Sequence, residues 1–322
     1  MWLDILFVVA GAVLILTGAD RLTDGAASIA RRFGIPELVI GLTIVAIGTS
    51  LPEFVVSFVA SLKGAASMSI GNIVGSNIFN TMLIVGATAM VAPIAVSRST
   101  VNKDIPFMLL ASLVVSALAL DHLVSGGTAD VLTRGDGIAL LGFMAVFITY
   151  TLALARSGGA EQPSSSDEQS AAVSIPVWKS VLFILYGLFG LIVGGELFVN
   201  GATGIARLAG LSDAVIGLTL VAGGTSLPEL ATSIIAARKG KSDIAIGNVI
   251  GSNMFNVFGI LGVCSCISPL PAEGLTWVDF GMLLFGAVLF WLFSRTQHRI
   301  IRWEGTVMVL CFLGYMTWLL NR

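Results

Sequence analysis

The chain has 322 residues, of which 56% are hydrophobic and only 11% charged, and its mean hydropathy is +0.96. Soluble domains carry about 25% charged residues, so this composition excludes an ordinary soluble protein. The formal net charge is −2, and no basic stretch suits nucleic acid. The three cysteines lie in apolar segments and fit neither a disulfide framework nor a four-ligand metal site.

Apolar runs of membrane-spanning length recur along the whole chain. About 20 such residues cross a bilayer as a helix, and the runs are too continuously apolar for barrel strands, which alternate. The first run lacks the basic start and cleavage motif of a signal peptide, so we expect it to be retained. The sequence predicts an all-α polytopic membrane protein whose ten helices span residues 3–20, 38–62, 69–91, 104–121, 135–155, 178–199, 214–237, 243–267, 275–294 and 302–320.

One polar segment interrupts this series. Residues 157–174 are acidic and rich in Gly and Ser, a composition that cannot bury apolar surface, so we expect a flexible linker. The linker divides the chain into a first five-helix repeat, 1–156, and a second, 175–322.

The two halves are related in sequence. Residues 41–57 match residues 217–233 at 12 of 17 positions, and residues 71–80 match 247–256 at 7 of 10. Both matches have an offset of 176 residues, which is too long for a solenoid repeat. The pattern indicates a duplicated domain.

Lys and Arg fall mainly on one side of the predicted membrane. With alternating loops, the side that holds the N-terminus carries four of the 17 basic residues, Lys63, Arg134, Arg207 and Arg322, and the other side carries thirteen. Cytoplasmic loops are enriched in Lys and Arg. We therefore expect a cytoplasmic linker and two extracytoplasmic termini in the cell (inner) membrane.

Five spans per repeat, an odd number, invert the second repeat relative to the first. Inverted repeats with interrupted helices at matching positions are typical of secondary transporters, which bind their substrate near the bilayer midplane. The sequence therefore predicts two inverted-topology repeats around a central site.

The duplicated blocks place polar groups inside the second and seventh spans. Glu53 and Glu229 lie mid-span, where an ionised carboxylate costs about 2.5–3.5 kcal/mol or more unless it meets a cavity or a cation. Pro52 and Pro228 remove a backbone donor just before them, so we expect carbonyls upstream, such as that of Ala46, to turn toward the centre.

The third and eighth spans supply more oxygens. Ser76 and Asn80 share a helix face, as do Ser252 and Asn256. Paired glycines at 71/75 and 247/251 predict close helix packing. Carboxylate, amide and hydroxyl oxygens without His or Cys suit hard cations such as Ca²⁺, whereas transition metals favour imidazole or thiolate.

The doubled GTSLPE and GSNxFN signatures resemble the two α-repeats of the Ca²⁺/cation antiporter superfamily, most closely its prokaryotic Na⁺/Ca²⁺ exchanger branch. The resemblance implies antiport of Ca²⁺ against Na⁺, with the first and sixth spans sliding against the rest. It implies an ion-ligand set of Ala46, Thr49, Ser50, Glu53, Ser76 and Asn80 with Ala222, Thr225, Ser226, Glu229, Ser252 and Asn256.

The chain departs from the superfamily at two points. Some members have Asp in place of Asn256, and that Asp accompanies K⁺-coupled exchange in one branch, so Asn256 argues against K⁺ dependence. The 18-residue linker is too short for the cytoplasmic Ca²⁺-sensing domains of animal exchangers.

Several residues also have purely structural interpretations. The glutamates could be protonated packing groups, Ser50 and Ser226 could bond carbonyls of their own helix, and Asn80 and Asn256 could only join helices. We expect Asn72, Asn77, Asn248 and Asn253 to be packing or capping groups. We expect the pairs Asp20/Glu196 and Asp24/Asn200 to lie at solvated helix ends.

Other functions remain open at this stage. A Ca²⁺/H⁺ or K⁺-dependent Na⁺/Ca²⁺ exchanger could use the same scaffold, and a passive channel is a further alternative. An enzyme is disfavoured because no catalytic constellation lies mid-membrane. We expect no cofactor and no obligate protein partner, only the lipid bilayer and the transported Ca²⁺ and Na⁺ ions.

Overall fold

The computed structural model describes residues 2–120, 130–157, 175–208 and 222–321, and this part is mostly helical. Before the linker it contains α1 (Trp2–Phe33), α2 (Glu37–Ile40), the π-helical segment η1 (Gly41–Val45), α3 (Ala46–Thr49), α4 (Leu51–Leu62), α5 (Ala66–Ile78), π-helical η2 (Phe79–Ile84), α6 (Val85–Val91), β1 (Ile94–Ala95), π-helical η3 (Thr100–Asp104), α7 (Ile105–Ala119), β2 (Val131–Leu132) and α9 (Arg134–Ser157). After the linker it contains α10 (Val177–Leu208), α12 (Ala222–Gly224), α13 (Leu227–Arg238), α14 (Ser242–Met254), π-helical η5 (Phe255–Leu261), α15 (Gly262–Ile267), β3 (Leu270–Pro271), α16 (Trp277–Arg295), β4 (Arg299–Ile300) and α17 (Arg302–Asn321).

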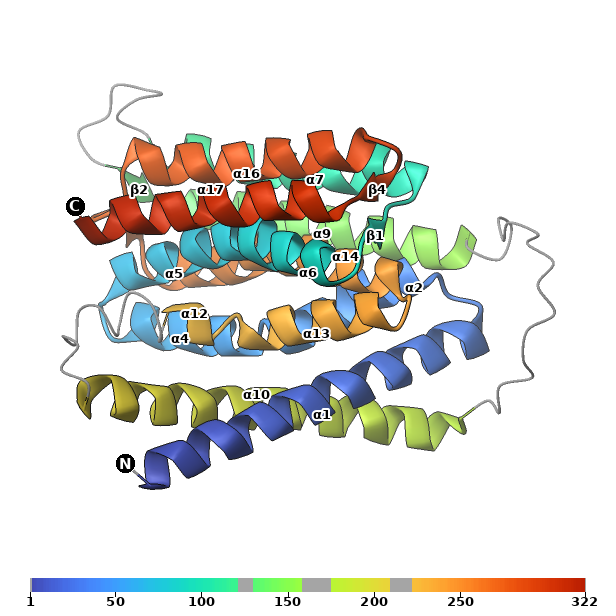
Figure 1. Cartoon of the computed structure of the whole chain (residues 1–322). Coiled ribbons are helices and arrows are strands. Elements are labelled where there is room, and N and C mark those ends of the chain that lie inside the picture. Colours follow the sequence, from blue (N-terminus) through green and yellow to red (C-terminus); the bar gives the residue numbers. More distant parts are fainter. Residues whose placement is uncertain (1, 121–129, 158–174, 209–221, 322) are drawn as a thin grey trace.

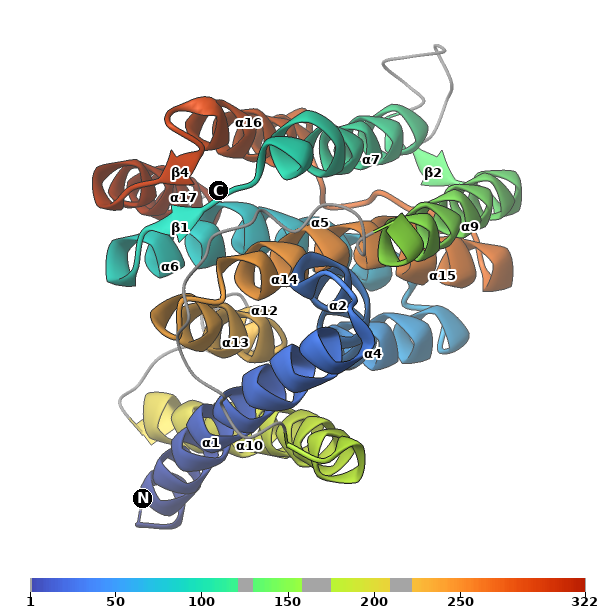
Figure 2. The same cartoon turned by 90° about the vertical axis from the view of Figure 1, so that its right-hand side faces the viewer.

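The long helices run side by side, with α1 and α10 crossing each other along one side of the bundle (Figure 1). Viewed along the bundle, α5 and α14 lie in the interior, and α6, α7, α9, α16 and α17 surround them away from α1 and α10 (Figure 2). The N- and C-terminal ends lie at the same end of the bundle (Figure 1).

Many of the described helices are long and apolar enough to cross a membrane. Eight qualify singly, and the pair Glu37–Thr49 and Leu51–Leu62, bent by 48°, forms a broken ninth. The first part of the predicted seventh span, in residues 209–221, lies outside the described residues, as do linker residues 158–174. The predicted helical, multi-pass character is therefore confirmed. The π-helical segments inside four of these spans were not predicted from the sequence.

Elements of the two halves coincide at the 176-residue offset. Thus α13 begins and ends 176 residues after α4, α14 after α5, and β3 after β1. The short antiparallel strand pairs, β1 with β4 and β2 with β3, each join one half to the other. The halves are therefore interlocked rather than separate bodies.

Helices α1 and α10 have 32 residues each and extend well beyond the predicted spans. Asp20 and Asp24 consequently lie within α1, and Glu196 and Asn200 lie within α10, so the prediction that these residues lie at helix ends is wrong. The Nζ of Lys239 at the end of α13 lies 2.7 Å from a carboxylate oxygen of each aspartate. This ion-pair cluster ties α1 to α13.

Glycines set the spacing between helices. A Cβ added to Gly18 of α1 would lie 2.9 Å from the carbonyl oxygen of Gly187 of α10, so the two backbones touch. A Cβ on Gly247 would lie 2.7 Å from the carbonyl oxygen of Leu38. The predicted close packing is thus confirmed for Gly247, whereas no described atom lies within 4 Å of a Cβ built on Gly71 or Gly75.

Candidate functional site

Two helix breaks create the site. Ser50 separates α3 from α4, Ser226 precedes α13, and both have non-helical ψ values near zero, 8° and 6°. Prolines occupy the first turn of α4 and α13, where a missing N–H is tolerated. The next residues, Glu53 and Glu229, are 1% and 0% exposed. Each break therefore delivers one carboxylate to the buried interior.

The two glutamates are bound by the opposite half of the chain. Ser50 Oγ donates to Glu229 Oε1 at 2.9 Å, and Ser226 Oγ donates to Glu53 Oε1 at 2.9 Å. Within the described residues, Oε2 of both glutamates is buried without a hydrogen-bond partner. Since buried polar atoms are nearly always paired, these two oxygens point to a ligand.

Two asparagines add open oxygens. Asn80 lies in η2 and Asn256 in η5, and they are 1% and 0% exposed. Their amide nitrogens donate to Asn253 Oδ1 and Asn77 Oδ1, at 3.2 and 2.9 Å. Their own Oδ1 atoms, and the buried Oγ of Ser76, have no partner in the described part of the chain. π-Helical turns are frequent at functional sites.

Ala46 and Thr49 face α14. The Ala46 carbonyl oxygen lies 3.4 Å from the Ser252 hydroxyl, and Thr49 Oγ1 lies 3.1 Å from Asn248 Oδ1. The Ala46 carbonyl also keeps its helical bond from the N–H of Ser50, at 3.0 Å. The expectation that the proline releases this carbonyl is therefore wrong. Pro52 lacks the N–H that would bond the carbonyl of Gly48, four residues earlier, and the Ala46 carbonyl is not affected.

The site has the chemistry of a hard-cation site. Two buried carboxylates would carry a charge of −2 when ionised, and the partnerless oxygens around them are amide and hydroxyl oxygens. Burial of such a charge without compensation is strongly unfavourable. One divalent cation or two monovalent cations would neutralise it, and Ca²⁺ takes about 6–8 oxygen ligands.

Comparison with known proteins agrees with a cation-binding site. The profile of the sodium/calcium exchanger protein family matches residues 3–153 and 179–321. The chain belongs to the sodium/calcium exchanger family. Relatives include the Escherichia coli inner membrane protein YrbG (37% identity over 99% of this chain and 96% of the relative) and the Methanosarcina acetivorans sodium/calcium exchanger MaX1 (32% identity over 97% of each). A solved structure of the sodium-calcium exchanger NCX_Mj, soaked without Na⁺ and Ca²⁺, superposes with a TM-score of 0.83 at 36% identity over 98% of each chain.

The resemblance inferred from the doubled signatures is thereby confirmed. The exchanger is a multi-pass membrane transporter rather than an enzyme. The family profile matches both halves of the chain, so the assignment to this family does not depend on one motif.

Most of the predicted site residues of the exchanger meet in one buried region. Nine of the twelve take part in the contacts above, and Ser76 is buried with no partner for its hydroxyl among the described residues. Of the other two, Thr225 is half-buried beside Ser226, and only the backbone of Ala222, at the start of α12, is described. Ser50 and Ser226 bond the opposite carboxylates instead of their own helices, contrary to the structural alternative.

Three asparagines that we expected to be packing or capping groups, Asn77, Asn248 and Asn253, bond directly to residues of the predicted site. Asn77 and Asn253 hold the amides of Asn256 and Asn80, and Asn248 Nδ2 donates to the carbonyl of Glu229 at 3.2 Å. Their recurrence at the 176-residue offset was the available signal, because Asn77 and Asn80 repeat as Asn253 and Asn256.

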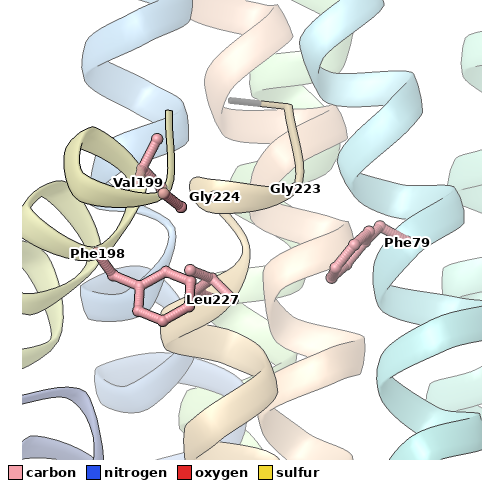
Figure 3. Close-up of a pocket in the computed structure, with 7 residues that line it drawn as sticks. Phe79, Phe198, Val199, Gly223, Gly224 and Leu227 are labelled. Carbon is pink, nitrogen blue, oxygen red and sulfur yellow. The ribbon is translucent and has the colours of Figure 1, made fainter. Parts of the chain in front are cut away.

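An apolar cavity of about 170 Å³ adjoins the site between α10, α12 and η2. Phe79 faces it from one side and Phe198, Val199 and Leu227 from the other (Figure 3). Phe79 directly precedes Asn80, and Leu227 directly follows Ser226. The lining is almost entirely apolar, so this cavity is not itself an ion-binding site.

Proposed function

We propose that the exchanger moves Ca²⁺ and Na⁺ in opposite directions through one site between Glu53 and Glu229. The observation that carries the proposal is the set of buried oxygens without partners in the described residues: one from each glutamate, one from Asn80, one from Asn256 and one from Ser76. Family membership gives the two ions, and the relatives named for sodium/calcium exchange match nearly the whole chain.

The proposed ligand set is the one implied by the signatures. Carboxylate and amide oxygens supply the main ligands, and hydroxyl and carbonyl oxygens complete the shell. The set comprises Glu53, Glu229, Asn80, Asn256, Thr49, Ser50, Ser76, Thr225, Ser226, Ser252, Ala46 and Ala222. Ser50 and Ser226 donate their hydroxyl hydrogens to the glutamates, which leaves lone pairs on both hydroxyl oxygens to ligate an ion.

The site charge explains why transport is exchange. With both glutamates ionised and no cation, the buried charge of −2 makes rearrangement of the empty site unfavourable. With one Ca²⁺ or two Na⁺ bound, the charge is neutral. A protein that changes its access only when loaded must return with the other ion, which is antiport.

The finer architecture is also part of the proposal. Ten spans form two inverted repeats, 1–156 and 175–322, joined by a cytoplasmic linker, 157–174, and both termini are extracytoplasmic in the cell (inner) membrane. The matching element bounds at an offset of 176 residues support it. Two chain ends at one end of the bundle (Figure 1) and the uneven Lys and Arg distribution support the orientation.

Reconstitution tests the function. Proteoliposomes loaded with Na⁺ and diluted into Na⁺-free buffer should accumulate radioactive Ca²⁺, and collapse of the Na⁺ gradient with a Na⁺ ionophore should stop the uptake. Protein-free liposomes are the control. Ca²⁺ influx that continues without any Na⁺ gradient would indicate a channel and contradict antiport.

A further inference from the structure

Two asparagine pairs cross between the halves beside the site. Asn256 Nδ2 donates to Asn77 Oδ1 at 2.9 Å, and Asn80 Nδ2 donates to Asn253 Oδ1 at 3.2 Å. All four side chains are at most 2% exposed. Asn77 and Asn253 thus lie behind the two amides that offer their oxygens to the site.

An amide can turn over without changing its shape. The oxygen and the NH₂ group of Asn have nearly the same size, so packing alone does not choose between the two orientations. One orientation offers an acceptor to a cation, and the other offers two N–H groups that repel it. Hydrogen bonds must therefore fix which atom of Asn80 and Asn256 faces the ion.

A first chain of hydrogen bonds fixes Asn256. Asn77 Nδ2 donates to the backbone carbonyl of Asn253 at 3.2 Å. A carbonyl only accepts, so Asn77 must direct its NH₂ group there and its oxygen toward Asn256. Asn256 must then present its NH₂ group to that oxygen, which leaves its own oxygen on the opposite side.

A second chain fixes Asn80 and begins at Thr81. The Thr81 hydroxyl donates to the carbonyl of Asn77 at 2.8 Å, so its oxygen is left to accept from Asn253 Nδ2, also at 2.8 Å. That nitrogen also lies 3.3 Å from Sδ of Met108, a weak acceptor. Asn253 therefore turns its oxygen to Asn80, whose NH₂ group occupies it.

We propose that Asn77, Asn253 and Thr81 are positioning residues that hold the amide oxygens of Asn80 and Asn256 toward the transported cation. Both chains end on a backbone carbonyl, which cannot reverse its polarity, so the orientation is set by the fold itself. The inference rests on the proposed function, because it assigns a role to residues behind the proposed ligands. None of the three needs to touch the ion.

Thr81→Val tests the second chain with the smallest change. It removes the hydroxyl but keeps the branched shape, so Asn253 loses the acceptor that orients it and Asn80 can turn its NH₂ group inward. Residues that orient metal ligands typically cost 10–100-fold in affinity when changed. We expect the Ca²⁺ concentration for half-maximal Na⁺-driven uptake to rise about tenfold in Thr81→Val, with the maximal rate per folded transporter much less affected.

The chain offers a matched control. Thr88 lies seven residues further along the same span, is 1% exposed, and its hydroxyl has no partner among the described residues. Thr88→Val should leave the half-saturating Ca²⁺ concentration unchanged. Thr81→Ser keeps the hydroxyl and loses only the methyl group, so it should have the half-saturating Ca²⁺ concentration of the wild type. If the methyl group mattered only for packing, Thr81→Ser would be impaired instead.

The outcomes separate the inference from the function. If the wild type shows no saturable, Na⁺-driven Ca²⁺ uptake, the proposed function is wrong. If the wild type shows it and Thr81→Val saturates at the same Ca²⁺ concentration as Thr88→Val, the positioning role is wrong. A fall only in the amount of folded protein, measured by thermal melting and size-exclusion chromatography, would likewise assign Thr81 to stability alone.

Discussion

The hydroxyl of Ser226 donates to the carboxylate of Glu53 at 2.9 Å, although 173 residues separate them. The reciprocal bond from Ser50 to Glu229 has the same length. Each helix break therefore presents its own glutamate and holds that of the other half. The two copies of the duplicated motif are therefore joined by a reciprocal pair of hydrogen bonds.

Glu53→Gln and Glu229→Gln should each reduce Na⁺-driven Ca²⁺ uptake to the level of protein-free liposomes. Either change lowers the site charge from −2 to −1 while keeping the shape and an oxygen for the serine bond. Uptake is measured at several Ca²⁺ concentrations, and folding by thermal melting.

Glu304→Gln is the matched control for these variants. Glu304 is also buried, at 1% exposure, but both of its oxygens accept hydrogen bonds, from Thr296 and from the N–H of Ile301. This change should lower the melting temperature without altering the half-saturating Ca²⁺ concentration. Normal Ca²⁺ flux in either site variant would refute the site.

Much of this site could be predicted from the sequence, because duplication singled out Glu53 and Glu229. The hydrogen bonds between the halves could not be predicted. The repeat shows that Ser50 corresponds to Ser226, but it does not show that Ser50 contacts Glu229. Helix α1 continues past Asp20, and the Lys239 that pairs with this aspartate comes from far along the chain. The amide orientations of Asn80 and Asn256 depend on partners from the other half, which local pattern does not encode.

Gly18→Val should destabilise the exchanger or prevent its folding. A Cβ at this position would meet the backbone of α10 at 2.9 Å, and α10 cannot withdraw without losing the neighbouring contacts. Overpacking of this kind costs about 1–3 kcal/mol or more. Gly142→Val in α9 is the control, because no described atom lies within 4 Å of its Cβ position. Equal melting temperatures of the two variants would contradict close α1–α10 packing.

Lys63 and Glu196 should meet in another state of the transport cycle. At the 176-residue offset, Lys63 corresponds to Lys239 and Glu196 corresponds to Asp20. Lys239 and Asp20 form the ion pair that joins α13 to α1. In the described structure Lys63 and Glu196 are both exposed and neither takes part in an ion pair. If the two inverted repeats exchange conformations during transport, the Lys63–Glu196 contact forms when the Lys239–Asp20 contact breaks.

Charge reversal measures that contact. Lys63→Glu and Glu196→Lys should each slow Na⁺-driven Ca²⁺ exchange about two- to five-fold, the range expected for an exposed ion pair. The double variant should recover most of the rate, because the pair is restored with its charges exchanged. Strictly additive effects in this double-mutant cycle would show that the two residues do not interact.

A reporter that is active only in the periplasm should work when fused to the C-terminus and fail when inserted within residues 157–174. The four-to-thirteen division of basic residues gives this expectation. A cytoplasm-specific reporter at the same two places should give the reverse result. If the linker fusion is active in the periplasm instead, the proposed orientation is wrong.

Na⁺ alone should drive Ca²⁺ uptake, without K⁺ and without a pH gradient. Asn256 is neutral and its NH₂ group is bound to Asn77, so the site has two carboxylates and no third charge that K⁺ would need to balance.

Protons compete for the same two carboxylates at low pH, and this competition can mimic proton coupling. The measurement therefore holds pH equal on both sides with a protonophore present, in K⁺-free buffer, and varies only the Na⁺ gradient. Uptake should follow Na⁺ and should not increase when K⁺ is added. Uptake that ignores Na⁺ but follows an imposed pH gradient would identify a Ca²⁺/H⁺ exchanger, and a strict K⁺ requirement would show that Asn256 does not decide ion coupling.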